Sequence, residues 1–487
     1  MESEVNIAAD AAEHDRVHPG LLLAVLSLAG LAYGVLSSAV IPALPTIQHA
    51  LHTTVTGTTW LLTGFLLSAA VGSSIVGRLG DMYGKEKLLL ATLVVLAAST
   101  LLAAVSDSLP ILILARVIQG VSGGIFPLAF AIMRDEFPAD RVAGGIGLMS
   151  AILGAGGGLG IVAGGVIVQH LGWHWLFWMP LVITVIAALC VWRFVPESPI
   201  RTPGKVNWLA AALMTAGMSL FLIAIAQTTV WGWGSPKVIA MGVGGLAISG
   251  IWVFVEVRSR TPLIDMTMMR IRGVWTTNLA AFLLGAGMFA AFIALPQIAQ
   301  EPKRSGFGYG ASIVVSGLYL LPCALIMGLF GTIAGKIARR WGSRQALIGG
   351  SAITVSSFVI LIVAVRHPAA MLASSALLGI GIGLAYSALG NLIVGAVDPT
   401  QTGVASGMNT VMRTLGGALG GQISATFIAH NTHHGLAGHT GYTETFIMST
   451  AFMLVCVAAS TLVPGVRRRV ASFSAAPAAK MSEVEVG

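Results

Sequence analysis

Long apolar stretches, separated by short polar turns, run through almost the whole chain. A helix rises about 1.5 Å per residue, so roughly twenty apolar residues cross the hydrocarbon core of a bilayer. By this criterion the pattern predicts fourteen membrane-spanning helices. The expected spans are Leu21–Val40, Thr58–Val76, Leu88–Val105, Leu109–Met133, Gly145–Val168, Trp175–Trp192, Trp208–Ala226, Val238–Val255, Val274–Leu295, Ser312–Ile333, Ala346–Val365, Ala369–Ile393, Val404–Ile428 and Phe446–Val463.

The order of these stretches divides the chain into two six-helix halves with two helices inserted between them. We expect a cytoplasmic N-terminal tail over residues 1–20 and an N-terminal six-helix bundle over residues 21–195. Residues 196–273 are predicted to form cytoplasmic links and the two inserted helices. The C-terminal bundle then covers residues 274–465, and residues 466–487 form a cytoplasmic tail.

Composition supports a membrane protein, and its basic residues indicate the orientation. A content of 56% hydrophobic and 9% charged residues excludes an ordinary soluble domain. The net charge of +8 does not indicate nucleic-acid binding, because the basic residues lie in short loops between spans. With both termini in the cytoplasm, the only basic residues left in outer loops are Lys237, Lys303, Arg304 and Arg366.

No residue pattern indicates a cofactor, a metal site or enzymatic chemistry. The cysteines Cys190, Cys323 and Cys456 fall in separate apolar spans, which gives neither a disulfide framework nor a metal-ligand spacing. A membrane-embedded enzyme would require paired acids, or histidines with acids, within the spans. The acids are instead predicted in loops, in tails or at span ends, so we expect a protein that is not an enzyme.

The turn between the second and third spans carries the most specific motif, GRLGDMYGKEK over residues 77–87. Its glycines allow a tight turn, and its basic residues keep that turn in the cytoplasm. Asp81 is an acid inside this basic turn and requires a partner, such as the positive end of a helix. We expect it to bridge to the N-terminal end of the thirteenth span near Thr402 and to hold the cytoplasmic side closed.

An internal repeat supports the division into halves. The segment GKIARRWGSR (residues 335–344) repeats the motif about 260 residues later, with Arg339 in the place of Asp81. The segment GLMSAILGAGGGLG (residues 147–160) likewise matches GMNTVMRTLGGALG (residues 407–420). The inserted helices explain why the offset exceeds half the chain, and parallel halves predict a substrate site between them near the midplane.

These motifs resemble those of a transporter family. The turn resembles the signature G-x-L-x-D-x-x-G-[RK]-x-[RK] of the major facilitator superfamily, and RVIQGVSGG (residues 116–124) resembles its R-x-x-Q-G signature. The segments IPALPTI (41–47), LGWHWLFWMP (171–180), WGWGSP (231–236) and EVRSRTPLID (256–265), together with fourteen spans, resemble its fourteen-span drug:proton antiporter subfamily of EmrB/QacA type. The resemblance implies an all-α polytopic fold, two six-helix halves plus two inserted helices. It also implies an efflux transporter that acts as a monomer in the bacterial inner membrane.

The polar residues predicted within the spans define a candidate substrate cavity between the first, fourth, ninth and twelfth spans, with the second, fifth, tenth and thirteenth alongside. These residues are Tyr33, Arg116, Gln119, Asn278, Tyr386, Asn391, Asn409 and Arg413. The resemblance links Arg116 to proton transfer or substrate contact, and a structural arginine bonded to helix carbonyls is the alternative. Because the deep ionisable residues are arginines, we expect neutral or anionic substrates.

Two further groups of residues are predicted to serve conformational change. The expected gate consists of Gly77, Asp81, Gly84, Lys85, Arg339 and Gly342. A glycine run in the fifth span, which resembles the antiporter signature but has Ile161 where proline is usual, is expected to act as a helix-packing hinge. Its members are Gly156, Gly160, Gly164 and Gly165.

The sequence therefore predicts secondary active efflux of small amphiphilic molecules, such as drugs, antibiotics or toxic metabolites, by alternating access and driven by the proton gradient. One departure bears on the coupling, because the first span lacks the aspartate that is common in this subfamily. An uptake permease of the same fold is the alternative, and the effect of expression on cellular accumulation distinguishes the two.

Overall fold

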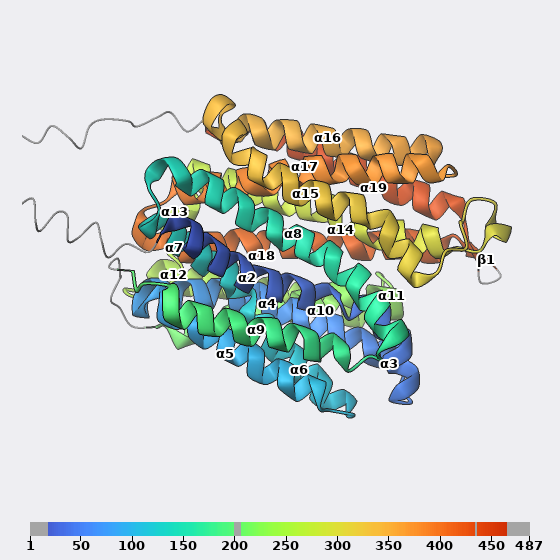
Figure 1. Cartoon of the computed structure of the whole chain (residues 1–487), viewed down its shortest axis with the longest axis horizontal. Coiled ribbons are helices and arrows are strands. Elements are labelled where there is room, and N and C mark those ends of the chain that lie inside the picture. Colours follow the sequence, from blue (N-terminus) through green and yellow to red (C-terminus); the bar gives the residue numbers. More distant parts are fainter. Residues whose placement is uncertain (1–17, 199–205, 434–435, 465–487) are drawn as a thin grey trace, which may run out of the picture.

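The structure is a computed structural model that describes residues 18–198, 206–433 and 436–464 (Figure 1). The predicted tails lie outside the described residues, apart from residues 18–20, and so does part of the predicted cytoplasmic link, residues 199–205.

The described chain is almost entirely helical. The N-terminal half contains α2 (Pro19–Ser38), η1 (Ile41–Ala43), α3 (Leu44–Ala50), α4 (Val55–Tyr83), α5 (Lys85–Ala104), α6 (Leu109–Val121), η2 (Ser122–Gly124), α7 (Ile125–Glu136), α8 (Ala139–His170) and α9 (Trp175–Phe194). The insert contains α10 (Trp208–Ala226), α11 (Thr228–Trp231), α12 (Pro236–Arg258) and α13 (Met266–Arg270). The C-terminal half contains α14 (Arg272–Gln300), η3 (Lys303–Ser305), α15 (Ile313–Trp341), α16 (Ser343–Ala364), α17 (Pro368–Ala396), η4 (Pro399–Gln401), α18 (Thr402–His430) and α19 (His439–Leu462). Two short antiparallel strands, β1 (Thr432–His433) and β2 (Leu436–Ala437), join α18 to α19.

Each predicted span corresponds to a long helix, and α6 and α7 together form the fourth. Thirteen helical segments in the described chain are long and apolar enough to cross a membrane. The remaining long helix, α18, is not among them, because glycine, threonine and serine are frequent along it and Arg413 lies near its middle. The all-α polytopic fold class predicted from the sequence is confirmed.

The turn at the sequence motif is much shorter than predicted. Helix α4 continues through Asp81 to Tyr83, and α5 begins at Lys85, so only Gly84 separates the two helices. Gly84 has φ +119°, a conformation that side-chain-bearing residues rarely adopt, and Gly342 takes φ +92° at the equivalent turn between α15 and α16. A single glycine in this conformation suffices to reverse the chain, so the rest of the motif stays helical.

The fourth span bends where it is richest in glycine. The one-turn 3₁₀ segment Ser122–Gly124 separates α6 from α7. Pro127 lies three residues after Gly124, and because proline has no N–H it cannot donate the helical hydrogen bond to Gly123. The break is therefore a consequence of local sequence.

The two halves lie side by side along the long axis of the molecule (Figure 1). Helices α14–α17 and α19 occupy one side in Figure 1 and α2–α7 with α9 the other, while α8 and α18 run between them. The most extensive contacts between the halves are made by two helix pairs, α4 with α18 and α8 with α15, and α7 and α8 also touch α18 and α17. We call these the α4–α18 seam and the α8–α15 seam. The end of the bundle that contains Gly84 and Gly342 is called the clamp end.

The inserted helices pack at the edge of one seam. Helix α10 pairs with α12 and also contacts both α4 and α18. At the end of the bundle away from the clamp, the indole N–H of Trp233 donates to the Thr426 hydroxyl of α18 at 2.9 Å. Near the clamp end, the Gln401 amide, just before α18, donates to the Asp265 carboxylate at 3.3 Å. The insert therefore contacts the α4–α18 seam near both ends.

Candidate functional site

At the clamp end, Asp81 joins the two halves directly. Its carboxylate accepts hydrogen bonds from the backbone N–H groups of Gly403 at 3.3 Å and Val404 at 3.1 Å, in the first turn of α18. The first N–H groups of a helix have no partners within the helix and carry partial positive charge. An ionised carboxylate at this position is therefore stabilised, and the contact lies beside Thr402, where the sequence indicated. Asp81 is only 1% exposed, so the turn does not leave this acid in solvent.

Glycines allow the helices of the α4–α18 seam to touch backbone to backbone. A Cβ atom on Gly77 would overlap the carbonyl of Gly403, and one on Gly407 would lie 2.6 Å from the Ser73 oxygen. These contacts involve main-chain atoms, which cannot move aside as a flexible side chain can. The close approach brings the carboxylate of Asp81 within reach of the α18 N-terminus.

The α8–α15 seam repeats this arrangement with different polar chemistry. A Cβ on Gly335 would lie 2.7 Å from the Gly144 Cα. In the internal repeat Gly335 is equivalent to Gly77, and Gly144 to Val404, the residue after Gly403. Arg339, in the place of Asp81, donates to the Asp140 carbonyl at 3.2 Å rather than capping a helix. The two seams therefore share their packing. Asp81 of α4 caps the N-terminus of α18 across one seam, whereas in the other seam the acid of the first α8 turn, Asp140, belongs to α8 itself.

Arg134 is a clamp residue that the sequence analysis missed. It belongs to α7 of the N-terminal half and donates to the Thr402 hydroxyl at 2.8 Å and the Val397 carbonyl at 2.9 Å in the C-terminal half. Asp398 lies close by, and hydrogen bonds from the N–H and hydroxyl of Thr400 hold the pKa of Asp398 below its usual value. This carboxylate is therefore ionised at neutral pH and provides a counter-charge near Arg134.

A buried ion pair supports the turn behind the clamp. Lys85, the first residue of α5, pairs with the Asp135 carboxylate of α7, and both side chains are 1% exposed. A lysine is unfavourable at a helix N-terminus, and Asp135 offsets this cost. The Ser198 hydroxyl, after α9, donates to the same carboxylate. Lys85 and Asp135 belong to the N-terminal half and Ser198 to the link that follows it, so this network fixes the α4–α5 turn without involving the C-terminal half.

A small enclosed cavity lies between the halves. It is lined by side chains of α7 and α8 from one half and of α17 and α18 from the other. Its volume of about 10 Å³ leaves room for little more than one water molecule. Of the predicted cavity residues, Tyr386, Asn409 and Arg413 line it. The halves are therefore in contact around the central site in this conformation.

Arg413 and Ser406 contribute the free polar groups of this cavity. The Arg413 guanidinium lies 4.7 Å from the centre of the Tyr386 ring. The Arg413 guanidinium makes no hydrogen bond or ion pair with another described residue. Ser406, two helical turns earlier on α18, is 2% exposed, and its hydroxyl has no hydrogen-bond partner within the described chain.

Arg116 lies elsewhere, fully buried among α2, α4 and α6. Its guanidinium donates to the carbonyls of Leu61 at 3.0 Å, Leu36 at 3.1 Å and Ser37 at 3.4 Å, and to the Gln119 side chain at 3.0 Å. These acceptors belong to the N-terminal half. The structure thus places Arg116 and Gln119 within that half, away from the residues that line the central cavity.

The remaining predicted polar residues occupy separate positions. Tyr33 packs against Phe65 and Phe126 within the N-terminal half. The Asn409 side-chain amide donates to the Asn278 side-chain oxygen at 3.0 Å, joining α18 to α14. Asn391 reaches across the halves instead, where its amide donates to the Ala143 carbonyl at 3.2 Å.

The predicted hinge glycines pack mainly within their own half. Cβ atoms on Gly156, Gly160 and Gly164 would each meet the backbone of α2 or of Ala39 just after it, whereas Gly154 and Gly158 face α15. Gly165 is buried in the same helix. Helix α8 continues from Ala139 to His170 without interruption. The glycine run thus brings α8 close to α2 on one face and to α15 on another.

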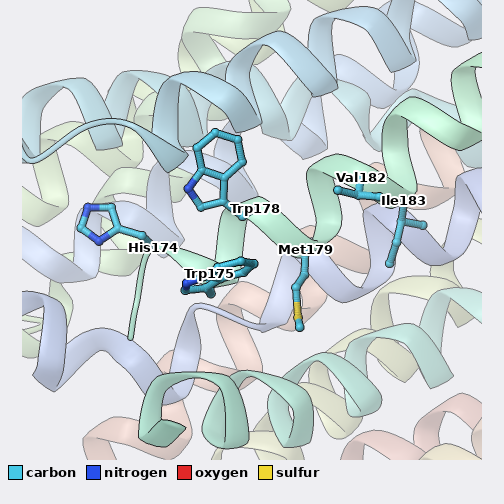
Figure 2. A pocket seen from close by; sticks show the side chains of 6 residues that line it. All are labelled: His174, Trp175, Trp178, Met179, Val182 and Ile183. Carbon is cyan, nitrogen blue, oxygen red and sulfur yellow. The ribbon is translucent and has the colours of Figure 1, made fainter. Parts of the chain in front are cut away.

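A larger hollow lies on the outside of the bundle, as Figure 2 shows. It is lined by six residues at the start of α9: His174, Trp175, Trp178, Met179, Val182 and Ile183. All six come from one short stretch, and only the histidine carries a polar ring. Exposed tryptophans at the end of a span are typical of the membrane–water interface. We therefore take the central cavity, between two repeated halves, as the candidate site.

Comparison with known proteins agrees with this arrangement. The sequence profile described as the Major Facilitator Superfamily matches residues 26–421, with a second match over residues 277–482. The chain belongs to the Major Facilitator Superfamily. The human organic anion transporter MFSD10 has a similar structure, with a TM-score of 0.65, 17% identity, and coverage of 91% of this chain and 99% of that one.

Several relatives of this chain are named as transport or export proteins. It is 27% identical over 370 residues to the multidrug transporter protein MdtP of Bacillus subtilis, covering 74% of this chain and 66% of the relative. It is 28% identical to the uridine/deoxyuridine transporter of Lactococcus lactis, covering 82% and 85%. It is 26% identical to the tetracenomycin C resistance and export protein of Streptomyces glaucescens, covering 79% and 71%. The superfamily predicted from the motifs is confirmed, and the chain is a multi-pass membrane transporter.

Two buried acids were not predicted from the sequence. The sequence analysis placed all acids outside the interior of the bundle, but Asp135 and Glu256 are buried. The Glu256 carboxylate accepts from the Trp252 indole and from the backbone of Leu263 and Ile264, which fixes the loop before α13. The presence of these acids in helical runs was the available signal, because an ionised side chain there requires a partner.

Proposed function

We propose that this transporter exports small amphiphilic molecules across the bacterial plasma membrane by alternating access, driven by proton entry. The observation that carries the proposal is the central cavity, which is lined by both repeated halves and closed at the clamp end by Asp81. Aromatic and aliphatic side chains with a few polar groups are typical of sites for small amphiphiles. The names of the Bacillus and Streptomyces relatives support export.

We place the clamp end in the cytoplasm, as the distribution of basic residues indicates. In this conformation the cytoplasmic entrance is closed, and the central cavity is too small for a substrate. Opening toward the cytoplasm requires Asp81 to leave Gly403 and Val404, and Arg134 to leave Thr402. The substrate then binds between the halves, and opening of the opposite end releases it.

We propose proton coupling but assign the transported proton to no particular residue. No acidic residue lines the cavity, as far as the described chain extends. The carboxylate that joins the halves is Asp81, at the clamp, and its hydrogen bonds to α18 are stronger in the ionised form. Protonation of this group would weaken the clamp, which gives proton entry a direct route to the conformational change.

Uptake of a metabolite is the second candidate function, and the name of the Lactococcus relative favours it. The fold itself does not determine the direction of transport, because the two ends of the bundle can open in either order. The direction of net transport in cells decides between these two functions.

The test is a compound panel in a bacterial strain that lacks its own efflux pumps. Export predicts that expression of the chain lowers cellular accumulation of some compounds and raises resistance to them. A protonophore should abolish the difference. Raised accumulation would instead support the permease, and an unchanged panel at verified expression would contradict export.

A further inference from the structure

The guanidinium of Arg413 is a half-buried cation that has no hydrogen-bond acceptor or ion-pair partner among the described residues. It lines the central cavity, and its recorded contact is with the aromatic face of Tyr386 at 4.7 Å. A guanidinium carries five N–H donors, and a low-dielectric interior makes an uncompensated charge costly. Arg116 shows the opposite situation, because protein oxygens accept its hydrogen bonds. The surroundings of Arg413 therefore differ from those of a purely structural arginine.

A second free donor faces the same cavity. The hydroxyl of Ser406 is buried and has no hydrogen-bond partner within the described chain. Ser406 and Arg413 are seven residues apart on α18, so they lie on one face of that helix. Asn409 and Thr410, between them, use their donors on Asn278 at 3.0 Å and on the Ser406 carbonyl at 3.1 Å. On α18, the two cavity-lining donors left free are therefore the serine hydroxyl and the guanidinium.

The opposite wall of the cavity has a different character. Phe126 and Phe130 of α7 and Leu153 of α8 provide apolar surface, and no acidic side chain lines the described cavity. The site thus combines a positive group and a hydroxyl on α18 with aromatic and aliphatic side chains on the opposite wall of the cavity. This arrangement is complementary to a molecule that has an apolar aromatic body and one anionic group.

We propose that Arg413 and Ser406 form an anion-binding subsite for the acidic oxygen group, a carboxylate or sulfonate, of an aromatic amphiphile. This inference rests on the proposed transport function and specifies the substrate class of the same cavity. A guanidinium binds two oxygens of such a group through parallel N–H bonds, and the serine hydroxyl donates a third. A cationic amphiphile meets repulsion from Arg413 instead. The anion enters when the two halves separate around the cavity.

Binding to the purified full-length protein tests the subsite independently of transport direction. The probes are 8-anilinonaphthalene-1-sulfonate and N-phenyl-1-naphthylamine, which share one aromatic body and differ by a sulfonate. We expect Arg413→Gln to weaken binding of the sulfonate at least about tenfold, and to change binding of the neutral amine less than about twofold. Retained binding of the neutral dye shows that the cavity is intact.

Conservative variants separate charge from geometry. Arg413→Lys keeps the charge but loses the forked donor geometry, so we expect an intermediate loss of about threefold for the sulfonate. Ser406→Ala should give a loss of similar size, about threefold, without changing binding of the neutral dye. The matched control is Arg366→Gln, which removes the same charge from an exposed loop between α16 and α17 and should change neither affinity.

Three results would overturn the subsite: wild-type protein that does not bind the sulfonate, a sulfonate affinity that Arg413→Gln leaves unchanged, or equal losses for both dyes. Equal losses would mean that Arg413 acts structurally, by packing on Tyr386. Export assays of the same variants keep the two proposals separate. Export with charge-insensitive binding refutes the subsite alone, whereas charge-selective binding without export of any compound refutes the proposed function alone.

Discussion

At the scale of single residues, the closed clamp depends on where a few charges lie relative to helix ends. Asp81 accepts from two N–H groups at the start of α18, and Arg134 donates to Thr402 beside them. Both side chains reach from one half to the other, so their hydrogen bonds must break whenever this end opens. Their contribution therefore appears in the conformational equilibrium more than in the stability of either half.

We expect Asp81→Asn to abolish most export while leaving the amount of folded protein nearly unchanged. The amide can still accept one hydrogen bond, but it loses a charge interaction with the helix N-terminus worth up to about 2 kcal/mol. A shift of this size changes a two-state equilibrium roughly thirtyfold. The measurements are export at matched expression and the unfolding temperature of the purified protein.

The control is Asp107→Asn, since the Asp107 side chain is 81% exposed and pairs with His174 away from the clamp. Export by Asp81→Asn at the wild-type level would show that this contact does not control the cycle.

The buried pair of Lys85 and Asp135 gives a different prediction. Removing one partner leaves an uncompensated buried charge, so we expect Asp135→Asn to destabilise the protein by about 3–5 kcal/mol. The double variant Lys85→Met/Asp135→Leu removes both charges, and we expect most folding and export to return. Thermal unfolding and export of the single and double variants test this. An unfolding temperature of Asp135→Asn equal to that of wild type would contradict the assigned role of the pair.

At the scale of elements, close backbone contact determines how the seams pack. In the α4–α18 seam, Gly77 meets Gly403 and Gly407 meets Ser73, and the internal repeat places Gly335 against Gly144 in the other seam. Any side chain at these positions would push two helices apart. The positions of these glycines could be read from the sequence, but which helix each one faces could not, because packing between distant segments decides it.

We expect Gly407→Ala to reduce export at least about fivefold. The added Cβ would lie 2.6 Å from the Ser73 carbonyl oxygen, so the helices must separate at an overpacking cost of about 1–3 kcal/mol. Gly349→Ala in α16 is the matched control, because a Cβ there meets no atom within 4 Å. If both variants export like wild type, close contact in the α4–α18 seam is not required.

At the scale of the whole molecule, the fold and the division into halves could be predicted from the sequence. The residues that line the cavity could be predicted only in part. Apolar periodicity and the repeated motif indicated the long helices, and Asp81 was correctly matched with the start of α18. Arg134 and Ser406 were missed because nothing in their local sequence shows what they face. Arg116 and Arg413 looked alike in the sequence, yet one is surrounded by carbonyl oxygens and the other faces the cavity.

The central claim is that the two ends of the bundle open in turn, and a reversible cross-link across the α8–α15 seam tests it most directly. A Cβ built on Gly317 lies 3.8 Å from the Cβ of Val162, within the range of a disulfide, at the end of the seam away from the clamp. In vesicles that contain the double variant Val162→Cys/Gly317→Cys, we predict that oxidation stops export and that reduction restores it. Each single-cysteine variant should export under both conditions. Export at the full rate by protein that remains cross-linked would contradict the account, because this end of the seam would then never open.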